Sequence, residues 1–377
     1  MNRLILLGNG FDLAHQLKTS YNDFILQYLK KAFTGAEKDK VYEDGLLKIT
    51  KRDRHPIKMG EIMSVNDYVD HFYEKGFKQI IGVSDIKAEG FANFYRNPFK
   101  IEIKNYLIEA LITNCSSCNW VDIENEFYEL LKSVLSVETE VHKREAVAQL
   151  NEGMGYLIKE LHEYLSTLPI PELNNEFEQI FRCPILHDEV VSMHLGTNPY
   201  PTMTMVLNFN YTNTVEPYLS KAIPPGTKFK TELNYIHGKL KDLENPLIFG
   251  FGDELDKDYI NIELDKTKGF FNYIKSFWYF STTNYHSLIR FIDHDDFQVF
   301  IMGHSCGLSD RTMLNMIFEH KNCKSIKIYY YQAPDGSTNF SELTQEISRH
   351  FTNKSEMRRR IVPLKLSRPM PQVNKST

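Results

Sequence analysis

Short apolar runs recur along the chain and predict the strands of one buried sheet. The first run, RLILL at residues 3–7, stops at Gly8. Further runs of this kind follow at residues 204–209, 233–237, 246–251, 298–302 and 325–331. Four of the six runs lack the alternation of apolar and polar residues that a half-exposed strand shows. Strands covered by helices on both faces have this pattern, so the runs predict a mostly parallel sheet.

Helical periodicity fills most of the chain between the first and second of these runs. Apolar side chains recur there at intervals of three and four residues, and the same spacing returns between the later runs. This order predicts a doubly wound, Rossmann-like α/β core with a large helical insertion after the first strand. We expect the core at residues 1–20 and 186–353 and the insertion at 21–185. The basic, proline-containing tail at 354–377 is expected to be solvated or partly disordered.

Composition narrows the class of protein. Of the 377 residues, 42% are hydrophobic and 13% aromatic, which suffices for a sizeable core, and the net charge of −5 does not favour nucleic acid or an anionic membrane. No apolar run approaches the roughly 18 residues of a membrane span, and the first run is interrupted too early for a signal peptide. Five cysteines, with a single C-x-x-C at Cys115 and Cys118, indicate reduced thiols in the cytoplasm and no bound metal.

The segments that follow the predicted strands are rich in small and polar residues. In open α/β sheets, ligands bind beyond the carboxyl ends of the strands. The segments that follow the first, second, third and fifth strands are GNGFD (8–12), NFNYTN (208–213), HG (237–238) and GHSCGLSD (303–310). The fourth strand is followed by GFGDELD. Glycine, amide, imidazole and hydroxyl groups suit a crevice that encloses a polar ligand.

The first of these segments contains a G-x-G turn between a strand and a helix. Gly8, Asn9 and Gly10 would let a phosphate or ribose approach backbone N–H groups at a helix N-terminus, although a plain tight turn explains them equally well. The dinucleotide fingerprint is incomplete because Leu13 stands where its third glycine belongs. The carboxylate of Asp12 would repel a pyrophosphate and would suit ribose hydroxyls instead.

Two amides and a histidine are the strongest candidates for chemistry. Asn208 and Asn210 lie two residues apart, so both leave the strand on one side and could clamp a ligand. Asn213 and Glu216 fit a variant capping box for the next helix. His237 follows Asn210 by 27 residues, enough for a crossover helix that makes the two strand ends neighbours. Histidine is the natural general base near neutral pH, and a satisfied core histidine is the alternative.

The late glycine turn and one acidic pair complete the candidates. Gly303, His304 and Ser305 would suit close approach of an adenine or ribose. Ser309 is expected to cap the following helix, with Asp310 in its first turn.

In the insertion, helical spacing places Glu124 at the edge of an apolar face, from which it could reach the crevice. A partly buried glutamate paired with Lys or Arg is the alternative. Asp122 is the expected N-cap of the same helix.

The motifs together resemble the AbiH family of bacteriophage abortive-infection proteins. The resemblance rests on LILLGNGFDLAHQLKTSYNDF, NFNYTNTVE, YIHGKL, LIFGFGD and IMGHSCGLSDRTMLNMIF, in that order and over almost the whole chain. More remotely, the motifs are similar to the sirtuin-like NAD-binding fold. That similarity implies that Gly8 and Gly10 form the first nucleotide turn and that Gly238 completes a His-Gly pair. It also implies that Gly303 and Ser305 form the late adenosine turn.

The same resemblance implies catalytic roles for Asn210 and His237. The chain departs from sirtuins at Asp12, where they usually have Ser, and at Thr212, where they usually have Asp, which bears on how a nucleotide would lie. The segment STTNYH (281–286) resembles the Asn motif of other sirtuin-like NADases, but no His-Gly follows it, so we do not assign it to the site.

The sequence therefore suggests a cytoplasmic anti-phage effector that hydrolyses NAD to nicotinamide and ADP-ribose. The catalytic groups would be His237, Asn210 and Asn208, and the partners NAD or a related nucleotide, a phage-derived trigger and a second copy of the chain. Two alternatives stay open. One is a nucleotide sensor without catalysis. The other is a metal-dependent nuclease toxin that uses Asp12, Asp122 and Glu124, with the basic tail on the nucleic-acid backbone.

Overall fold

The computed structural model describes residues 1–52, 64–75, 98–114, 120–191, 199–221 and 230–373. The chain forms two compact units. The first, here called the sheet unit, comprises Met1–Thr19, Leu165–Tyr259 and Ile274–Thr377. The second, here called the insertion unit, comprises Ser20–Tyr164 and Ile260–Tyr273.

The sheet unit contains a six-stranded sheet in which every pairing is parallel. Its strands are β1 (Asn2–Leu7), β5 (Met203–Asn208), β6 (Lys230–Tyr235), β7 (Phe297–Met302), β8 (Cys323–Tyr330) and β9 (Arg368–Pro369). Their order is β6-β5-β1-β7-β8-β9. From β1 the chain builds outward to β6 on one side and then returns to build from β7 on the other. The prediction of a doubly wound, mostly parallel sheet is confirmed, and its switch point lies between β1 and β7.

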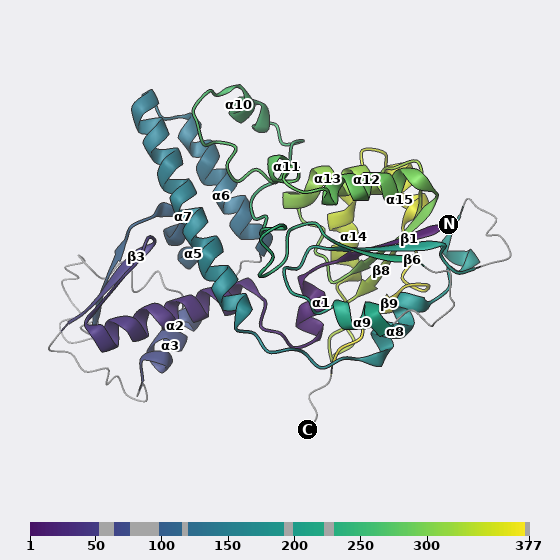
Figure 1. The fold of residues 1–377 in the computed structure, drawn as a ribbon, viewed down its shortest axis with the longest axis horizontal. Coiled ribbons are helices and arrows are strands. Elements are labelled where there is room, and N and C mark those ends of the chain that lie inside the picture. Colours follow the sequence, from purple (N-terminus) through teal and green to yellow (C-terminus); the bar gives the residue numbers. More distant parts are fainter. Residues whose placement is uncertain (53–63, 76–97, 115–119, 192–198, 222–229, 374–377) are drawn as a thin grey trace. The chain divides into compact units, whose positions relative to one another are not determined.

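Helices cover both faces of this sheet, which explains the lack of alternation in the strand sequences. Leu4 and Leu6 pack in a core cluster with α12 (Asn284–His294), α13 (Arg311–Phe318) and α14 (Phe340–Ser348). Ile5 and Leu7 pack in a second cluster with α1 (Asn9–Ala14), α8 (Asn175–Arg182) and α9 (Glu216–Lys221). In Figure 1, α12 and α13 lie on one side of the sheet and α1, α8 and α9 on the other.

The strand predicted at residues 246–251 is wrong. This segment is a buried coil that makes only an isolated bridge between Phe251 and Ile274. Its backbone contacts the turn after β6, where Ile248 N–H donates to the carbonyl of His237 at 2.8 Å. Gly238, with φ +88°, makes this approach possible, since a Cβ there would lie 2.1 Å from the carbonyl oxygen of Pro246.

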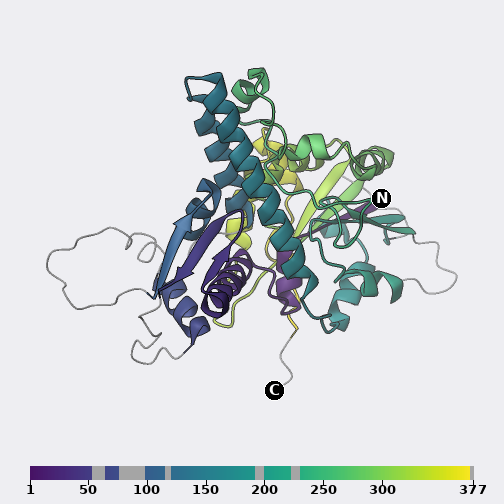
Figure 2. The ribbon, with the colours of Figure 1, turned by 60° about the vertical axis from the view of Figure 1, so that its left-hand side comes forward.

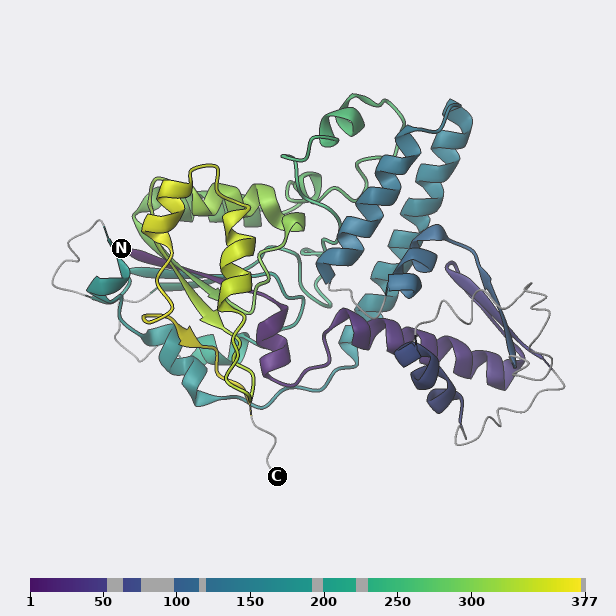
Figure 3. The same ribbon diagram turned by 180° about the vertical axis from the view of Figure 1, so that it is seen from behind.

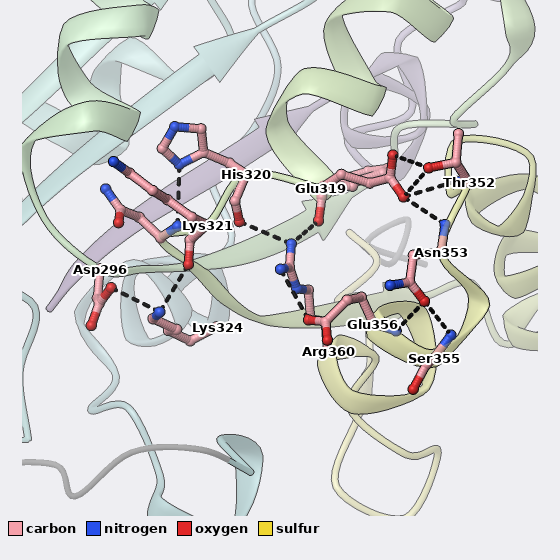
Figure 4. A network of polar contacts seen from close by, with 12 residues as sticks. Asp296, Glu319, His320, Lys321, Lys324, Thr352, Asn353, Ser355, Glu356 and Arg360 are labelled. Carbon is pink, nitrogen blue, oxygen red and sulfur yellow. Dashed lines mark hydrogen bonds and ion pairs between the residues drawn. The ribbon is translucent and has the colours of Figure 1, made fainter.

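The basic tail is ordered on the sheet unit as far as residue 373, so the prediction of partial disorder is wrong for these residues, although many of their side chains are exposed as expected of a solvated segment. It forms α15 (Lys354–Arg360) and β9 (Figure 3). A basic residue has a clear role there, because Arg360 donates to the carbonyl of His320 at 2.9 Å (Figure 4). Arg360 also binds the carbonyl of Phe318. The guanidinium thus satisfies carbonyls at the end of α13 that have no partner within the helix.

The insertion unit combines helices with a small sheet, which was not predicted from the sequence. The helices are α2 (Tyr21–Asp39), α3 (Val65–Lys75), α5 (Tyr106–Asn114), α6 (Trp120–Leu135), α7 (Glu140–Ser166) and most of α10 (Tyr259–Leu264). An antiparallel sheet of β2 (Val41–Glu43), β3 (Leu47–Lys51) and β4 (Phe99–Ile103) packs beside α2 (Figure 2). None of the described helices has the length and apolar character that crossing a membrane requires.

Candidate active site

Two glycine turns meet at the switch point of the sheet. Gly8 N–H donates to the carbonyl of Met302 at 3.1 Å, and Gly10 N–H donates to the carbonyl of Gly303 at 2.8 Å. A Cβ on Gly8 would lie 2.5 Å from His304 Cα, and one on Gly10 would lie 2.7 Å from Gly303 Cα. The glycines are therefore required by the close packing of the two turns. Their N–H groups bind protein carbonyls, so contact of this turn with a nucleotide stays a prediction.

Asp12 is a buried carboxylate behind the first turn. It lies on α1, is 1% exposed, and its Oδ2 accepts a hydrogen bond of 2.6 Å from Thr212 Oγ1. Its other oxygen, Oδ1, accepts no hydrogen bond within the described part of the chain. Burial raises the pKa of Asp12 to about 6, and the hydrogen bond from Thr212 only partly opposes this. Asp12 is thus ready to accept a proton or a hydrogen-bond donor near neutral pH.

We expect the Asp12→Asn variant to be more stable than the natural chain at neutral pH. The folded-state pKa of Asp12, about 6, exceeds its ordinary value of 3.8, so the stability that this group contributes is complete below about pH 4 and is lost as the pH rises through 6. A shift of roughly two units corresponds to about 3 kcal/mol at most. Urea unfolding of both chains between about pH 4 and pH 7.5 measures the difference.

The exposed Asp188→Asn variant is the control for replacing a carboxylate by an amide, and its free energy of unfolding should differ little from that of the natural chain. A constant difference between Asp12→Asn and the natural chain across this range would contradict the assignment of a buried, titrating carboxyl group.

Asn208 and Asn210 are both buried and tie the end of β5 to its surroundings. Asn208 Oδ1 accepts the backbone N–H of Asn210 at 3.0 Å. Asn210 Nδ2 donates to the carbonyl of Gly8 at 3.0 Å, across to the first turn. No hydrogen bond from the described residues reaches Asn210 Oδ1, so this oxygen is available as an acceptor. Asn208 thus positions the backbone, and Asn210 is the amide with an unused oxygen.

His237 follows β6, the parallel neighbour of β5, as predicted from the spacing of the two motifs. Its Nε2 lies 3.2 Å from Asp310 Oδ1 and 3.2 Å from the hydroxyl of Tyr279. Since a carboxylate only accepts, the proton of the neutral ring belongs on Nε2. Within the described residues no hydrogen bond reaches Nδ1, whose lone pair is then free to take a proton. This arrangement suits a general base oriented by a carboxylate.

Asp310 is surrounded by positive and imidazole groups. It ends the short helix η3 (Leu308–Asp310), and Lys275 of α11 (Lys275–Trp278) lies 2.9 Å from its Oδ1. His304 Nε2 lies 3.8 Å from its Oδ2. Burial acts to raise the pKa of Asp310, but the charge of Lys275 and the two imidazoles outweigh it and hold that pKa well below its usual range. Asp310 is therefore ionised at neutral pH.

His304 belongs to the same cluster in neutral form. Its Nδ1 accepts the backbone N–H of Cys306 at 3.0 Å, which places the ring proton on Nε2, facing Asp310. Burial lowers the pKa of His304 to about 4, so the ring stays uncharged at neutral pH. Its neighbour Ser305, predicted to contact adenosine, is exposed on the turn. The assignment of this turn to adenosine stays a prediction.

Three predicted helix caps are wrong. Ser309 and Asp310 are buried in η3, and α13 begins at Arg311 without a side-chain cap. Glu216 opens α9, and its carboxylate accepts from Tyr235 and Lys239 in place of closing a capping box with residue 213. Asp122 lies within α6, which includes Trp120, and so is not its N-cap.

Asp310 and Lys275 are the functional candidates that sequence reasoning missed. The sequence pattern predicts Asp310 in the first turn of a helix, although it also follows a glycine turn at the end of a strand. Lys275 lies in FFNYIKSFWYF, where one lysine interrupts an aromatic segment. Lysine is almost never fully buried unless it is paired, so this pattern was a usable signal.

The remaining candidates lie in the insertion unit. Glu124 is buried on α6, and the side chain of Asp122 is outside the described residues, as are Cys115 and Cys118. In the part of the chain that the structure describes, no three His, Cys, Asp or Glu side chains gather so as to hold a metal ion. The site above is built from the sheet unit alone.

A doubly wound parallel sheet with a histidine, carboxylates and amides gathered beyond its carboxyl ends defines a Rossmann-like α/β protein with a candidate enzyme site at the switch point. The model of the family described as Bacteriophage abortive infection AbiH matches residues 4–332. The chain belongs to the AbiH family, which supports a role in abortive infection by bacteriophage. Neither a curated protein nor a solved structure matches it.

Proposed function

We propose that this AbiH protein is an abortive-infection effector of the cytoplasm that binds NAD and hydrolyses it to nicotinamide and ADP-ribose. The contact between His237 and Asp310 carries the proposal. It leaves one imidazole nitrogen free as a base, at the sheet edge where α/β proteins bind their ligands.

The reaction requires one base and no added acid. The oxygen of a water molecule forms a bond to C1′ of the ribose while the bond from C1′ to the nicotinamide nitrogen breaks. The electron pair of that bond neutralises the positive nicotinamide ring, and a proton of the water passes to His237 Nδ1. Hydrolysis of an N-glycosidic bond resembles that of a glycoside, with an oxocarbenium-like transition state.

The amides and the first turn would orient the substrate. Asn210 offers its unused Oδ1 to the water or to a ribose hydroxyl, and Asn208 holds the backbone that presents it. The causes of the raised pKa of Asp12 include no cation, so a neutral hydroxyl group suits its carboxylate better than a phosphate does. Gly8, Asn9 and Gly10 would lie beside the nucleotide.

Measurement of the NAD concentration in phage-infected cells tests the proposal. In cells with the natural chain, we expect NAD to collapse after infection, and nicotinamide and ADP-ribose to appear in equal amounts. Cells with Asn210→Ala should keep their NAD, because the water loses its orienting acceptor. The exposed Asn175→Ala is the matched control and should behave as the natural chain. Extracts assayed by chromatography at intervals after infection give these quantities.

The same experiment separates the alternatives. Unchanged NAD with intact protection would remove the hydrolase function. Binding of NAD without turnover would then favour the sensor. Magnesium-dependent toxicity that is lost in Glu124→Ala but kept in His237→Ala would favour the nuclease. For the hydrolase we expect a homo-oligomer that a phage-derived component activates.

A further inference from the structure

We infer that Lys275 is a positioning residue of this site, whose ammonium group holds Asp310 in place and offsets its charge, so that His237 faces an ion pair and not a bare carboxylate. The inference deepens the proposed function and rests on it for the reaction that the base serves. The relevant groups come from three separate segments: the end of β6, α11 and η3.

The pair of Lys275 and Asp310 is more than a stabilising contact. Lys275 is 1% exposed and Asp310 is 6% exposed, so both charges have been taken out of water. The cost of removing two charges from water commonly equals or exceeds the gain from pairing them, and a well-packed apolar pair is often at least as stable. Stability alone therefore does not account for a buried ion pair at this position.

The geometry connects the pair to His237. Lys275 Nζ and His237 Nε2 contact the same oxygen, Asp310 Oδ1, at 2.9 and 3.2 Å. One carboxylate oxygen thus accepts from both groups at once. The position of the imidazole and the position of the ammonium group are fixed by a shared partner.

The other groups around the ring are neutral. The hydroxyl of Tyr279 lies 3.2 Å from Nε2 of His237. The ring of Phe209 packs against the imidazole, with ring centroids 4.9 Å apart. His304 faces the second oxygen of Asp310 with an uncharged ring, because burial lowers its pKa to about 4. Burial likewise lowers the pKa of His350, which binds the carbonyl of Cys306 behind the turn. Among the described side chains that pair with the carboxylate of Asp310, Lys275 alone carries a permanent positive charge, since the neighbouring Arg311 pairs with Asp253.

This arrangement orients His237 as a base and limits how strongly the carboxylate favours the protonated ring. A bare carboxylate beside His237 would stabilise the imidazolium form relative to the neutral ring. Lys275 opposes that attraction while Asp310 still fixes the proton on Nε2. Removing Lys275 should therefore raise the pH at which the ring loses its proton, and removing the charge of Asp310 should lower it.

Histidine ring signals of the full-length chain, labelled with ¹⁵N, test this in a pH titration by NMR. Comparison with His237→Gln identifies the signal among the 13 histidines. In Lys275→Met we expect the titration midpoint of His237 to rise by roughly one pH unit or more. Lys275→Arg should restore the natural midpoint. In assays of NAD turnover, the acid limb of the pH profile of kcat/KM should also move to higher pH in Lys275→Met. The KM measured at high pH should stay unchanged.

An unchanged or lowered midpoint in Lys275→Met would overturn the inference. Because that variant leaves the buried Asp310 without its positively charged partner and can fail to fold, Asp310→Asn and the double variant Lys275→Met/Asp310→Asn form a second comparison. The double variant should titrate at higher pH than Asp310→Asn, and equal midpoints would also overturn the inference. The titration needs no turnover. Expected midpoints together with intact NAD would refute the proposed hydrolysis and leave the role of Lys275 at the ring standing.

Discussion

If the chain hydrolyses NAD as proposed, replacing His237 by glutamine is expected to lower the rate by about 10²–10⁴-fold, the usual contribution of a general base. Glutamine keeps a similar length and an N–H group that can donate to Asp310, so the cluster around the carboxylate is preserved. It cannot take up the proton of the attacking water. The loss should therefore appear in kcat, while the affinity for NAD changes only a few-fold, because no contact to the nucleotide depends on the base.

Purified full-length chains and a direct assay of released nicotinamide measure this effect, with calorimetric titration for NAD binding. His294→Gln is the matched control, since His294 is exposed at the end of α12. Its rate should equal that of the natural chain. A natural rate in His237→Gln would exclude this residue as the base. Equal losses in both variants would point to an effect on folding.

The parallel sheet could be predicted because each core strand is a short apolar run covered on both faces. The β1 side chains Ile5 and Leu6 face different core clusters, so neither face has a polar pattern. Burial alone did not distinguish a strand from a coil at residues 246–251. There, the apolar side chains are buried as in a strand, but Pro246 and Gly250 interrupt the run and the backbone pairs with the turn after β6.

The site could be predicted only where its residues follow strands directly. Asn210 and His237 come after neighbouring parallel strands, and the topology alone brings them to one edge. Lys275 reaches Asp310 from α11 across 35 residues of chain, a contact that no local pattern specifies. The small sheet of the insertion unit carried a usable signal, because residues 99–103 alternate between apolar and charged side chains. Helical spacing on either side of these short strands concealed it.

Replacing Gly303 by alanine is expected to destabilise the sheet unit by about 3–5 kcal/mol, a large loss of stability for a single added methyl group. Gly303 has φ +72°, and a Cβ there would lie 2.2 Å from Phe11 N and 2.6 Å from Gly10 C. Both are backbone atoms, so no side chain can move to make room. Either the turn after β7 or the turn after β1 would have to shift, and the hydrogen bond from Gly10 to Gly303 would be lost.

Gly336→Ala is a control that separates crowding from backbone strain. Gly336 also has a positive φ, +86°, but no atom lies within 4 Å of its Cβ position. Alanine there should lower the free energy of unfolding by about 1–2 kcal/mol, from the strain of the left-handed backbone conformation alone. Urea unfolding of the two variants gives the difference, which reports the packing of one turn on the other. Equal losses would mean that the two turns are not in tight contact at the switch point. A larger loss in Gly303→Ala, accompanied by a fall in NAD turnover, would mean that this contact sets the positions of Asn210 and His304.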